Sequence, residues 1–474
     1  MLPPLLPDAD TALYRQVYRT LRQAILQGAL PPGSRLPSSR AFAQRWQVAR
    51  NTVLEAFDLL VAEGYLVTRP GSGTFVADVP PTESQPLSSP PPPLRLSDWA
   101  RRALEGPFTT ASQAVEIDFR VGKVPTELFP SDEWAASLRA RARDLRGLLG
   151  GYGDELGPLE TREALCAYLV RERGVLATPD MVMLSSGSQG SLDALARTFL
   201  EAGRVAAVED PGYLAGRRVF AATGATVVPV GVDEQGLDPA QLPERADLLY
   251  TTPAHQFPTG AVLPLARRLE LLEWASRVGA WVIEDDYNSE FRFESRPLSA
   301  LQGLAPQTVV YVGTFSKSLS PALRAGYLVA PPPLIAALAA TRYLTDRQPP
   351  TLDSLALADF LNSGGFARHL RRARARALER QHALLEALRT HLPDWEVPSS
   401  GAGLHLYVRL PRGISEAALL EAAAHARVGV DTAGRFALRR AVPAALMTFA
   451  HLEPPVIEQG VRRLAAALAH APAL

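Results

Sequence analysis

The stretch YVGTFSKSLSPALRAGY, residues 311–327, decides how most of this chain is interpreted. Its lysine, Lys317, follows an apolar run typical of a strand, and it lies among hydroxyl side chains and the guanidinium of Arg324. Such groups suit a phosphate held beside an amine. The chain has 47 Arg but only two Lys, Lys123 and Lys317, and an arginine cannot supply a neutral amine. We therefore predict a nucleophilic Lys317 whose pKa is lowered by burial and by Arg324, with an ordinary surface lysine as the alternative.

Helical and strand patterns alternate around this stretch. Helical patterns at 159–173 and 262–278 alternate with short apolar runs at 205–208, 226–230, 247–250, 281–285 and 309–312. The alternation predicts a mostly parallel sheet covered by helices, hence an α/β domain. The run WVIEDD (281–286) ends in three acids, and the carboxyl end of a buried strand faces the crevice where such sheets bind ligands.

Four further features suit a ring-bearing phosphate ligand beside Lys317. Asp285 can pair with a protonated ring nitrogen, and Tyr287 can donate to a phenolate oxygen. The loop 186–189 precedes a helix, so its backbone amides and the helix dipole favour an anion, and Tyr213 can stack on the ring. Each has an ordinary alternative: a helix cap or magnesium ligand for Asp285, a plain turn for the loop, and a core position for Tyr213.

The N-terminal residues follow a different pattern. Residues 11–77 carry eight Arg against three acids, which is a weak electrostatic sign of nucleic-acid binding. Helical spacing predicts a helix at about 11–27, a second helix capped by Ser38, and a third over 50–64. The third helix is expected to bury Val53, Phe57, Leu60 and Val61. Two short β runs around the turn 70–73 predict a hairpin, so we expect a helix-turn-helix followed by a wing.

The start of the third helix is the expected point of contact with DNA bases. Arg50, Asn51 and Thr52 lie there, where a recognition helix presents side chains to base edges. Phosphate contacts are expected from Arg35, Ser39, Arg40 and the glycine-rich turn that includes Gly73. The alternative is a helical module for dimerisation or protein binding.

Composition sets the domain boundaries. Seven prolines lie between Pro80 and Pro93, which predicts a semi-rigid spacer, with a loop wrapped on one domain as the alternative. We assign 1–78 to the DNA-binding domain, 79–113 to a Pro/Ser-rich linker and 114–474 to a large effector and dimerisation domain. With one cysteine and no apolar run of 18 residues, the chain is expected in the cytoplasm without disulfides or membrane spans. The eight His show no metal-ligand spacing, so we expect no metal.

The first domain also resembles a known family. GSRLPSSRAFAQRWQVARNTVLEAFDLLVAEGYLVTRPGSGTFV (33–76) is similar to the winged helix-turn-helix of GntR regulators. The resemblance implies a dimer on a repeated or palindromic double-stranded operator. Residue by residue, it points to Arg35, Arg40, Arg50, Thr52 and Gly73.

Residues 114–474 resemble fold-type I pyridoxal-phosphate (PLP) enzymes of the aminotransferase class I/II family. The segments HQFPTG (255–260), IEDDYNSEFRF (283–293), GTFSKSL (313–319) and HLRRARARALER (369–380) make the whole chain similar to the MocR/GabR subfamily of GntR regulators. The resemblance implies that Lys317 forms the internal aldimine, Asp285 contacts the ring nitrogen and Tyr287 the phenolate oxygen. The remaining cofactor positions are Ser188, Gln189, Tyr213, Thr314, Ser316 and Arg324.

Two departures limit this resemblance. Aminotransferases usually place Asn where this chain has Phe257, so His255 or Gln256 must replace its contact with the phenolate oxygen, or the contact is absent. Members that bind an amino-acid carboxylate commonly have an Arg in the segment equivalent to 445–450, which has none here. The alternatives for that carboxylate are Arg217, Arg435 and Arg439.

The function implied is a PLP-dependent, DNA-binding transcriptional regulator that senses an amino compound, or PLP itself, through aldimine chemistry at Lys317. The fold implies a homodimer, head-to-tail, with each large domain beside its partner's winged helix. We expect no physiological turnover. The alternatives are a working aminotransferase with a DNA-binding tether, and a regulator whose large domain only dimerises.

Overall fold

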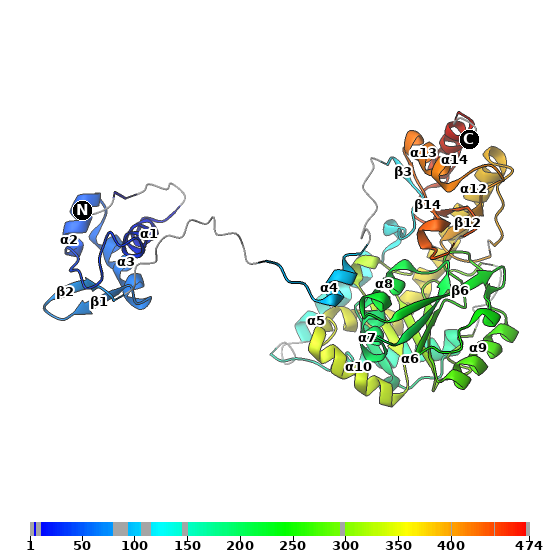
Figure 1. Ribbon diagram of the computed structural model, residues 1–474, viewed down its shortest axis with the longest axis horizontal. Coiled ribbons are helices and arrows are strands. Elements are labelled where there is room, and N and C mark those ends of the chain that lie inside the picture. Colours follow the sequence, from blue (N-terminus) through cyan, green and yellow to red (C-terminus); the bar gives the residue numbers. More distant parts are fainter. Residues whose placement is uncertain are drawn as a thin grey trace. The chain divides into compact units, whose positions relative to one another are not determined.

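The computed structural model describes residues 4–5, 11–78, 93–105, 115–144, 150–293, 299–399, 401–439 and 441–470. The chain divides into two compact units, Met1–Arg95 and Leu96–Leu474, and both are drawn in Figure 1. Within the described parts of the chain, no helix is long and apolar enough to cross a membrane.

The first unit is a three-helix bundle with a two-stranded wing. Its elements are α1 (Leu13–Leu26), α2 (Ser39–Trp46), α3 (Arg50–Ala62), β1 (Leu66–Arg69) and β2 (Gly73–Val76). The hydroxyl of Ser38 accepts the amide of Ala41 and so caps α2 as predicted. Gln47 takes a left-handed conformation and ends the helix. The turn between α2 and α3 is therefore set by local sequence.

The buried face of α3 differs from the prediction at one position. Val53, Phe57 and Leu60 lie in the core of the unit, but Val61 is 37% exposed. A helix advances by about 100° per residue, so Val61 points away from the stripe that the other three form. The prediction that Val61 is buried is wrong.

The second unit is built on an eight-stranded sheet in the order β4-β11-β10-β9-β8-β5-β6-β7. Neighbouring strands from β10 through β9, β8 and β5 to β6 run parallel, and β11, β4 and β7 join antiparallel. The bounds are β4 Val182–Ser185, β5 Val205–Asp210, β6 Thr226–Asp233, β7 Gly236–Leu237, β8 Leu248–Thr251, β9 Trp281–Asp286, β10 Val309–Thr314 and β11 Gly326–Val329. The predicted α/β class is confirmed.

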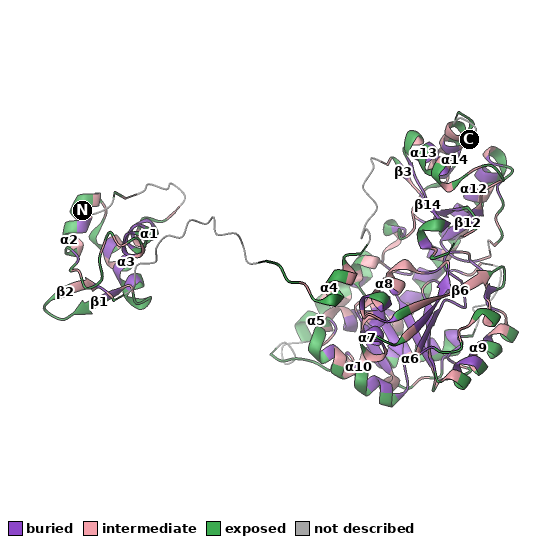
Figure 2. Ribbon diagram, viewed as in Figure 1, coloured by how far each residue is buried: buried purple, intermediate pink, exposed green. Residues whose placement is uncertain are grey.

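Helices cover both faces of this sheet because alternate strand residues point to opposite faces. One face packs on α7 (Ser188–Phe199), α8 (Leu214–Ala222) and α10 (Pro332–Thr345). The other packs on α6 (Leu159–Arg173), α9 (Leu265–Val278) and α11 (Thr351–Asn362). In Figure 2 the strands are mainly purple, hence buried, and the outer helix faces are green, hence exposed.

A smaller lobe completes the second unit. Its antiparallel sheet has the order β12-β15-β14, and a short parallel pair joins β13 to β3. The bounds are β3 Ile117–Asp118, β12 His405–Arg409, β13 Val428–Gly429, β14 Asp431–Thr432, β15 Ala444–Thr448, α12 Gly365–His391, α13 Glu416–Ala426 and α14 Pro454–Ala469. One further helix, α5 (Ser131–Asp144), packs beside α11 in the large lobe.

Part of the predicted linker is a packed helix. Residues 98–103 form α4 (Asp98–Ala103), which Ser97 caps. The guanidinium of Arg102 donates to the carbonyl of Ala222 at the end of α8, at 3.1 Å. No proline follows Pro93 until Pro107, so the extended-spacer interpretation fails for this segment. The proline-rich residues 79–92 lie outside the described residues.

Candidate functional site

A cavity of about 320 Å³ lies at the carboxyl ends of β8, β9 and β10 and the start of α7. All nine residues predicted to contact the cofactor line it: Ser188, Gln189, Tyr213, Asp285, Tyr287, Thr314, Ser316, Lys317 and Arg324. Residues from segments more than 130 positions apart in the chain therefore meet in one place. Thr252, Asn288 and His405 line it too, and of these Thr252 and Asn288 were not assigned from the sequence.

Lys317 follows β10 and is mostly buried at the wall of the cavity. Burial lowers the pKa of its amine, and the nearby charge of Asp285 acts in the opposite direction. Arg324, which we expected to contribute, is not among the causes of this shift. Its guanidinium donates instead to the carbonyl of Ser186 at 2.6 Å. Desolvation alone therefore increases the neutral, nucleophilic fraction of Lys317.

Of the three acids that end β9, only Asp285 lines the cavity. Side chains alternate along a strand, so Glu284 and Asp286 point to the other face. There, Glu284 accepts the backbone amides of residues 301–302, and Asp286 pairs with buried Arg173. These contacts leave Asp285 as the one carboxylate of WVIEDD available to a ligand.

The carboxylate of Asp285 is buried and incompletely paired. Its Oδ2 accepts the hydroxyl of Tyr250 at 2.7 Å, but its Oδ1 has no hydrogen-bond partner among the described residues. Burial raises the pKa of Asp285 to about 7, and the neighbouring charges of Asp286 and Glu209 add to the rise. A cationic N–H donor would satisfy this oxygen. Tyr250, which fixes the carboxylate, was not predicted from the sequence.

The loop before α7 has the geometry of an anion site. Gly187 has φ +77°, a conformation that favours glycine, and a Cβ there would lie 2.9 Å from a guanidinium nitrogen of Arg324. Ser188 begins α7, whose free amides and dipole attract negative charge. The hydroxyls of Thr314 and Ser316, 2.9 Å apart, line the same cavity.

Pyridoxal phosphate fits these groups. The hydroxyl of Tyr287, like Asp285 Oδ1, lacks a hydrogen-bond partner within the described part of the chain. A protonated ring nitrogen, a phenolate oxygen and a phosphate are the groups that Asp285, Tyr287 and the α7 loop can bind. Burial raises the pKa of Tyr213 to about 12, so its hydroxyl stays protonated and the side chain that lines the cavity is uncharged.

The two predicted substitutes for the missing Asn do not line the cavity. Gln256 donates to Glu209 and to the Pro211 carbonyl. His255 is buried behind the cavity wall, with its ring centroid 6.0 Å from that of Tyr287 and 5.8 Å from that of His405, and burial lowers its pKa to about 3. Phe257 itself lines the cavity, as does Asn288, whose Nδ2 has no partner in the described residues.

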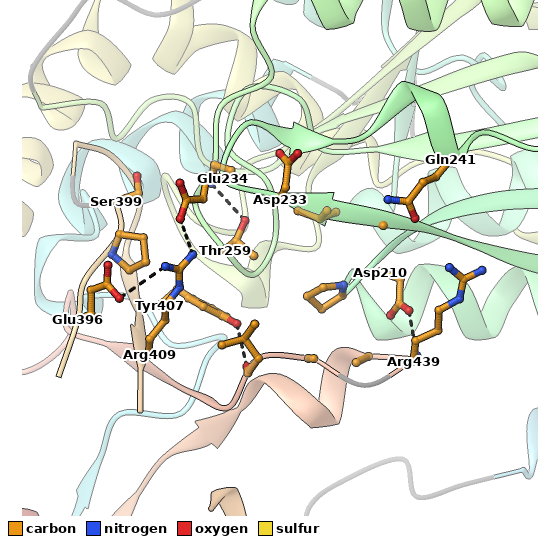
Figure 3. A pocket seen from close by; sticks show the side chains of 18 residues that line it. Asp210, Asp233, Glu234, Gln241, Thr259, Glu396, Ser399, Tyr407, Arg409 and Arg439 are labelled. Carbon is orange, nitrogen blue, oxygen red and sulfur yellow. Dashed lines mark hydrogen bonds and ion pairs between the residues drawn. The ribbon is translucent and has the colours of Figure 1, made fainter. Parts of the chain in front are cut away.

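None of the three arginines considered for a carboxylate lines this cavity. Arg435 pairs with Asp431, and a guanidinium nitrogen of Arg217 lies 3.4 Å from the carbonyl of Phe436. Arg439 lines a different pocket, of about 630 Å³, shown in Figure 3. Three cationic side chains are among the described residues that line the Lys317 cavity: Lys123, Lys317 and Arg324.

The larger pocket in Figure 3 lacks the reactive groups of the first. Arg409 lies between Glu234 and Glu396 and pairs with both. The carboxylate of Asp210 accepts the backbone amides of residues 438 and 439. No lysine is among the described residues that line this pocket. Its size therefore does not make it the better candidate for amine chemistry.

In the first unit, the residues predicted to contact DNA lie in or next to α2, at the start of α3 and in the wing. Arg40 and Asn51 are exposed, and Thr52 is partly buried in the first turn of α3. Arg50, also exposed, donates from Nε to the hydroxyl of Ser39 at 3.3 Å. The guanidinium of Arg35 lies against Gly73 of the wing, 3.1 Å from where a Cβ would stand.

Comparison with known proteins decides the family. The model for "Bacterial regulatory proteins, gntR family" matches residues 13–76, and that for "Aminotransferase class I and II" matches residues 115–462. The "Probable rhizopine catabolism regulatory protein MocR" of Rhizobium meliloti is 36% identical over 97% of this chain and 94% of its own length. The chain belongs to the MocR/GabR subfamily of GntR regulators. The HTH-type transcriptional regulator TauR of Rhodobacter capsulatus is 38% identical over 81% of each chain.

A solved structure extends the comparison to the fold of the large unit. The α-aminoadipate aminotransferase LysN of Thermus thermophilus, complexed with N-(5'-phosphopyridoxyl)-L-leucine, matches with a TM-score of 0.71 and 28% identity. The match covers 79% of this chain and 97% of LysN. This MocR/GabR-type chain is thus a PLP-dependent, DNA-binding transcriptional regulator, and its cofactor is pyridoxal 5'-phosphate.

The pKa of Asp285 gives a testable pH dependence in the cofactor-free regulator. A folded-state pKa of about 7, above an unfolded value of about 4, means that the folded state loses stability as pH rises through this interval. Asp285→Asn removes this loss. We expect the stability of the variant relative to wild type to increase by up to about 3 kcal/mol between pH 5 and pH 7, measured by denaturant unfolding. Glu284 titrates equally in both proteins, so a pH-independent difference would contradict the assignment.

Proposed function

We propose that this regulator binds operator DNA through its first unit and senses a primary amine, or PLP itself, at Lys317. The observation that carries the proposal is the position of Lys317: a desolvated amine in the same cavity as Asp285 Oδ1 and Tyr287, whose polar atoms lack partners among the described residues. When bound, PLP supplies an aldehyde that reacts with primary amines, and a ring that withdraws electrons.

The residues of the cavity have separate tasks in this proposal. Asp285, oriented by Tyr250, holds a proton on the ring nitrogen, because an ionised carboxylate in this buried place needs a cationic partner. Tyr287 donates to the phenolate oxygen, and Tyr213 covers the ring. The phosphate is bound by Ser188, Gln189, Thr314, Ser316 and Arg324.

Lys317 couples ligand binding to the protein. Its amine would hold the aldehyde of PLP, and a competing primary amine would take its place there and leave Lys317 free. Free Lys317 can then take up a proton, which places a new charge beside Asp285 in a desolvated cavity. A ligand shifts a conformational equilibrium only by its different affinities for the two states, and this change of charge and contacts is the difference that we assign.

The first unit supplies DNA recognition. We assign base contacts to Arg50, Asn51 and Thr52 and phosphate contacts to Arg35, Ser39, Arg40 and the backbone at Gly73. Ser39 positions Arg50 through their hydrogen bond. We further propose that the chain acts in the cytoplasm as a head-to-tail homodimer, which a two-fold repeated operator requires.

The DNA contacts can be separated by their response to sequence and salt. An operator is first selected from random oligonucleotides with the wild-type chain. Arg50→Ala is expected to weaken operator binding about tenfold or more and to reduce the preference over random DNA. Arg40→Ala is expected to weaken binding to the operator and to random DNA equally. It should also reduce the slope of log affinity against log salt concentration by about one, the loss of one phosphate contact. Equal effects of the two variants on sequence preference would contradict the assignment.

Because the chain has only two lysines, the residue that bonds to the cofactor can be identified directly. The PLP-loaded chain is reduced with borohydride, digested and analysed by mass spectrometry. We expect the pyridoxyl group on Lys317 and none on Lys123, although both line the cavity. Lys317→Ala should lose the visible absorption band, and Lys123→Ala should keep it.

The same protein distinguishes a sensor from a transaminase. An amine that shifts the visible band and leaves it shifted supports a sensor. Steady release of a keto acid would show turnover, for which free Lys317 is the available base. Labelling of Lys123, or no band after incubation with PLP, would overturn the proposal.

A further inference from the structure

Both lysines of this chain line the same cavity. The sequence has 47 Arg and two Lys, and Lys123 and Lys317 both contribute to the wall of the 320 Å³ cavity. We propose that Lys123 binds an acidic group of the effector whose amine reacts at Lys317. The effector is then an amino acid or aminosulfonic acid, rather than a simple amine. This inference rests on the proposed function and names its ligand class.

The segment that carries Lys123 is held firmly against the small lobe. After β3, the buried Phe119 donates its amide to the Gly429 carbonyl at 2.8 Å and accepts the amide of Thr448 at 2.7 Å. Thr448 itself lines the cavity. Two residues later, the amide of Val121 donates to the carboxylate of Asp431 at 2.9 Å. These bonds fix the place where the chain presents Lys123.

The ion pair with Asp118 does not fully compensate the charge of Lys123. Asp118 accepts two bonds from the Arg120 guanidinium, at 2.8 and 2.7 Å, and one from Lys123 Nζ at 2.6 Å. Burial would raise the pKa of Asp118, but the bonds from Arg120 and Lys123 hold it well below its usual value. Two cations thus share one carboxylate. The Lys123 side chain is 48% exposed, so its remaining donors are available to a ligand.

The other cations of the cavity have other tasks. Lys317 is the reacting amine, and Arg324 lies at the anion loop before α7. Burial lowers the pKa of His405 to about 4, which leaves it neutral. β15, where related proteins commonly have an Arg, is buried and apolar up to Met447. Within the described lining, Lys123 is therefore the cation left for an acidic group.

A lysine also explains why the ligand class includes both acids. The ammonium is a compact charge with three rotatable donors, whereas the fork of arginine matches a planar carboxylate. Lys123 can therefore bind a carboxylate or a tetrahedral sulfonate. The experiment distinguishes a carboxylate ligand from a sulfonate ligand by their dissociation constants.

The test compares ligands that share an amine and differ in their acidic group. The PLP-loaded full chain is titrated with 3-aminopropanoate, 2-aminoethanesulfonate and propylamine at constant ionic strength. Binding is measured by the visible band and, independently, by the thermal midpoint. We expect wild type to prefer at least one acid over propylamine, and Lys123→Gln to weaken binding of that acid about tenfold. Propylamine binding should change less than about twofold.

Two variants control for structural damage. Lys123→Arg keeps the charge and should retain most of the preference. Arg120→Gln removes a cation from the same Asp118 cluster, but Arg120 does not line the cavity, so the preference should persist. Equal loss in Arg120→Gln and Lys123→Gln, or a wild type that binds propylamine as well as both acids, would overturn the role of Lys123 and leave the proposed function standing. A chain whose band responds to none of the three ligands would overturn the role of Lys123, and the proposed function would then stand with PLP itself as the signal.

Discussion

The buried carboxylate of Asp285 is the constraint around which the cavity is organised. An ionised carboxylate in a desolvated place is costly unless a cation or several donors pair with it. Tyr250 satisfies one oxygen, and none of the described residues satisfies the other. The cofactor-free protein meets this cost with a proton, which is why burial raises the pKa of Asp285 to about 7. A cofactor with a protonated ring nitrogen pairs with the carboxylate and removes this free-energy cost. The site therefore favours cofactor binding independently of any contact with an effector.

The parallel sheet explains why the other groups lie near this carboxylate. β8, β9 and β10 run in one direction, so their carboxyl ends meet at one edge. Tyr250, Asp285 and Lys317 lie at or just beyond those ends. The start of α7 supplies an anion site at the same edge. A phosphate, a ring and an aldehyde can therefore be bound together at this edge, with the reacting lysine in the turn directly after β10.

The sequence was sufficient for features with local signals. The bounds predicted for α6, 159–173, agree with the structure, and the left-handed Gly174 that ends the helix is a local signal. Tyr250 and Lys123 could not be placed, since strand register and the packing of the small lobe bring them to the cavity. The sequence correctly placed Arg324 near the site, but burial and the charge of Asp285, not Arg324, are the causes that shift the pKa of Lys317.

The central claim is that the state of Lys317 controls DNA affinity. Its most direct test is the dissociation constant of the selected operator for the full chain without PLP, with PLP, and with PLP plus an amine that shifts the visible band. Wild type should show a different operator affinity in at least two of these states, and Lys317→Ala should show one affinity in all three. Equal responses of wild type and Lys317→Ala, or a wild-type affinity that never changes, would contradict the account.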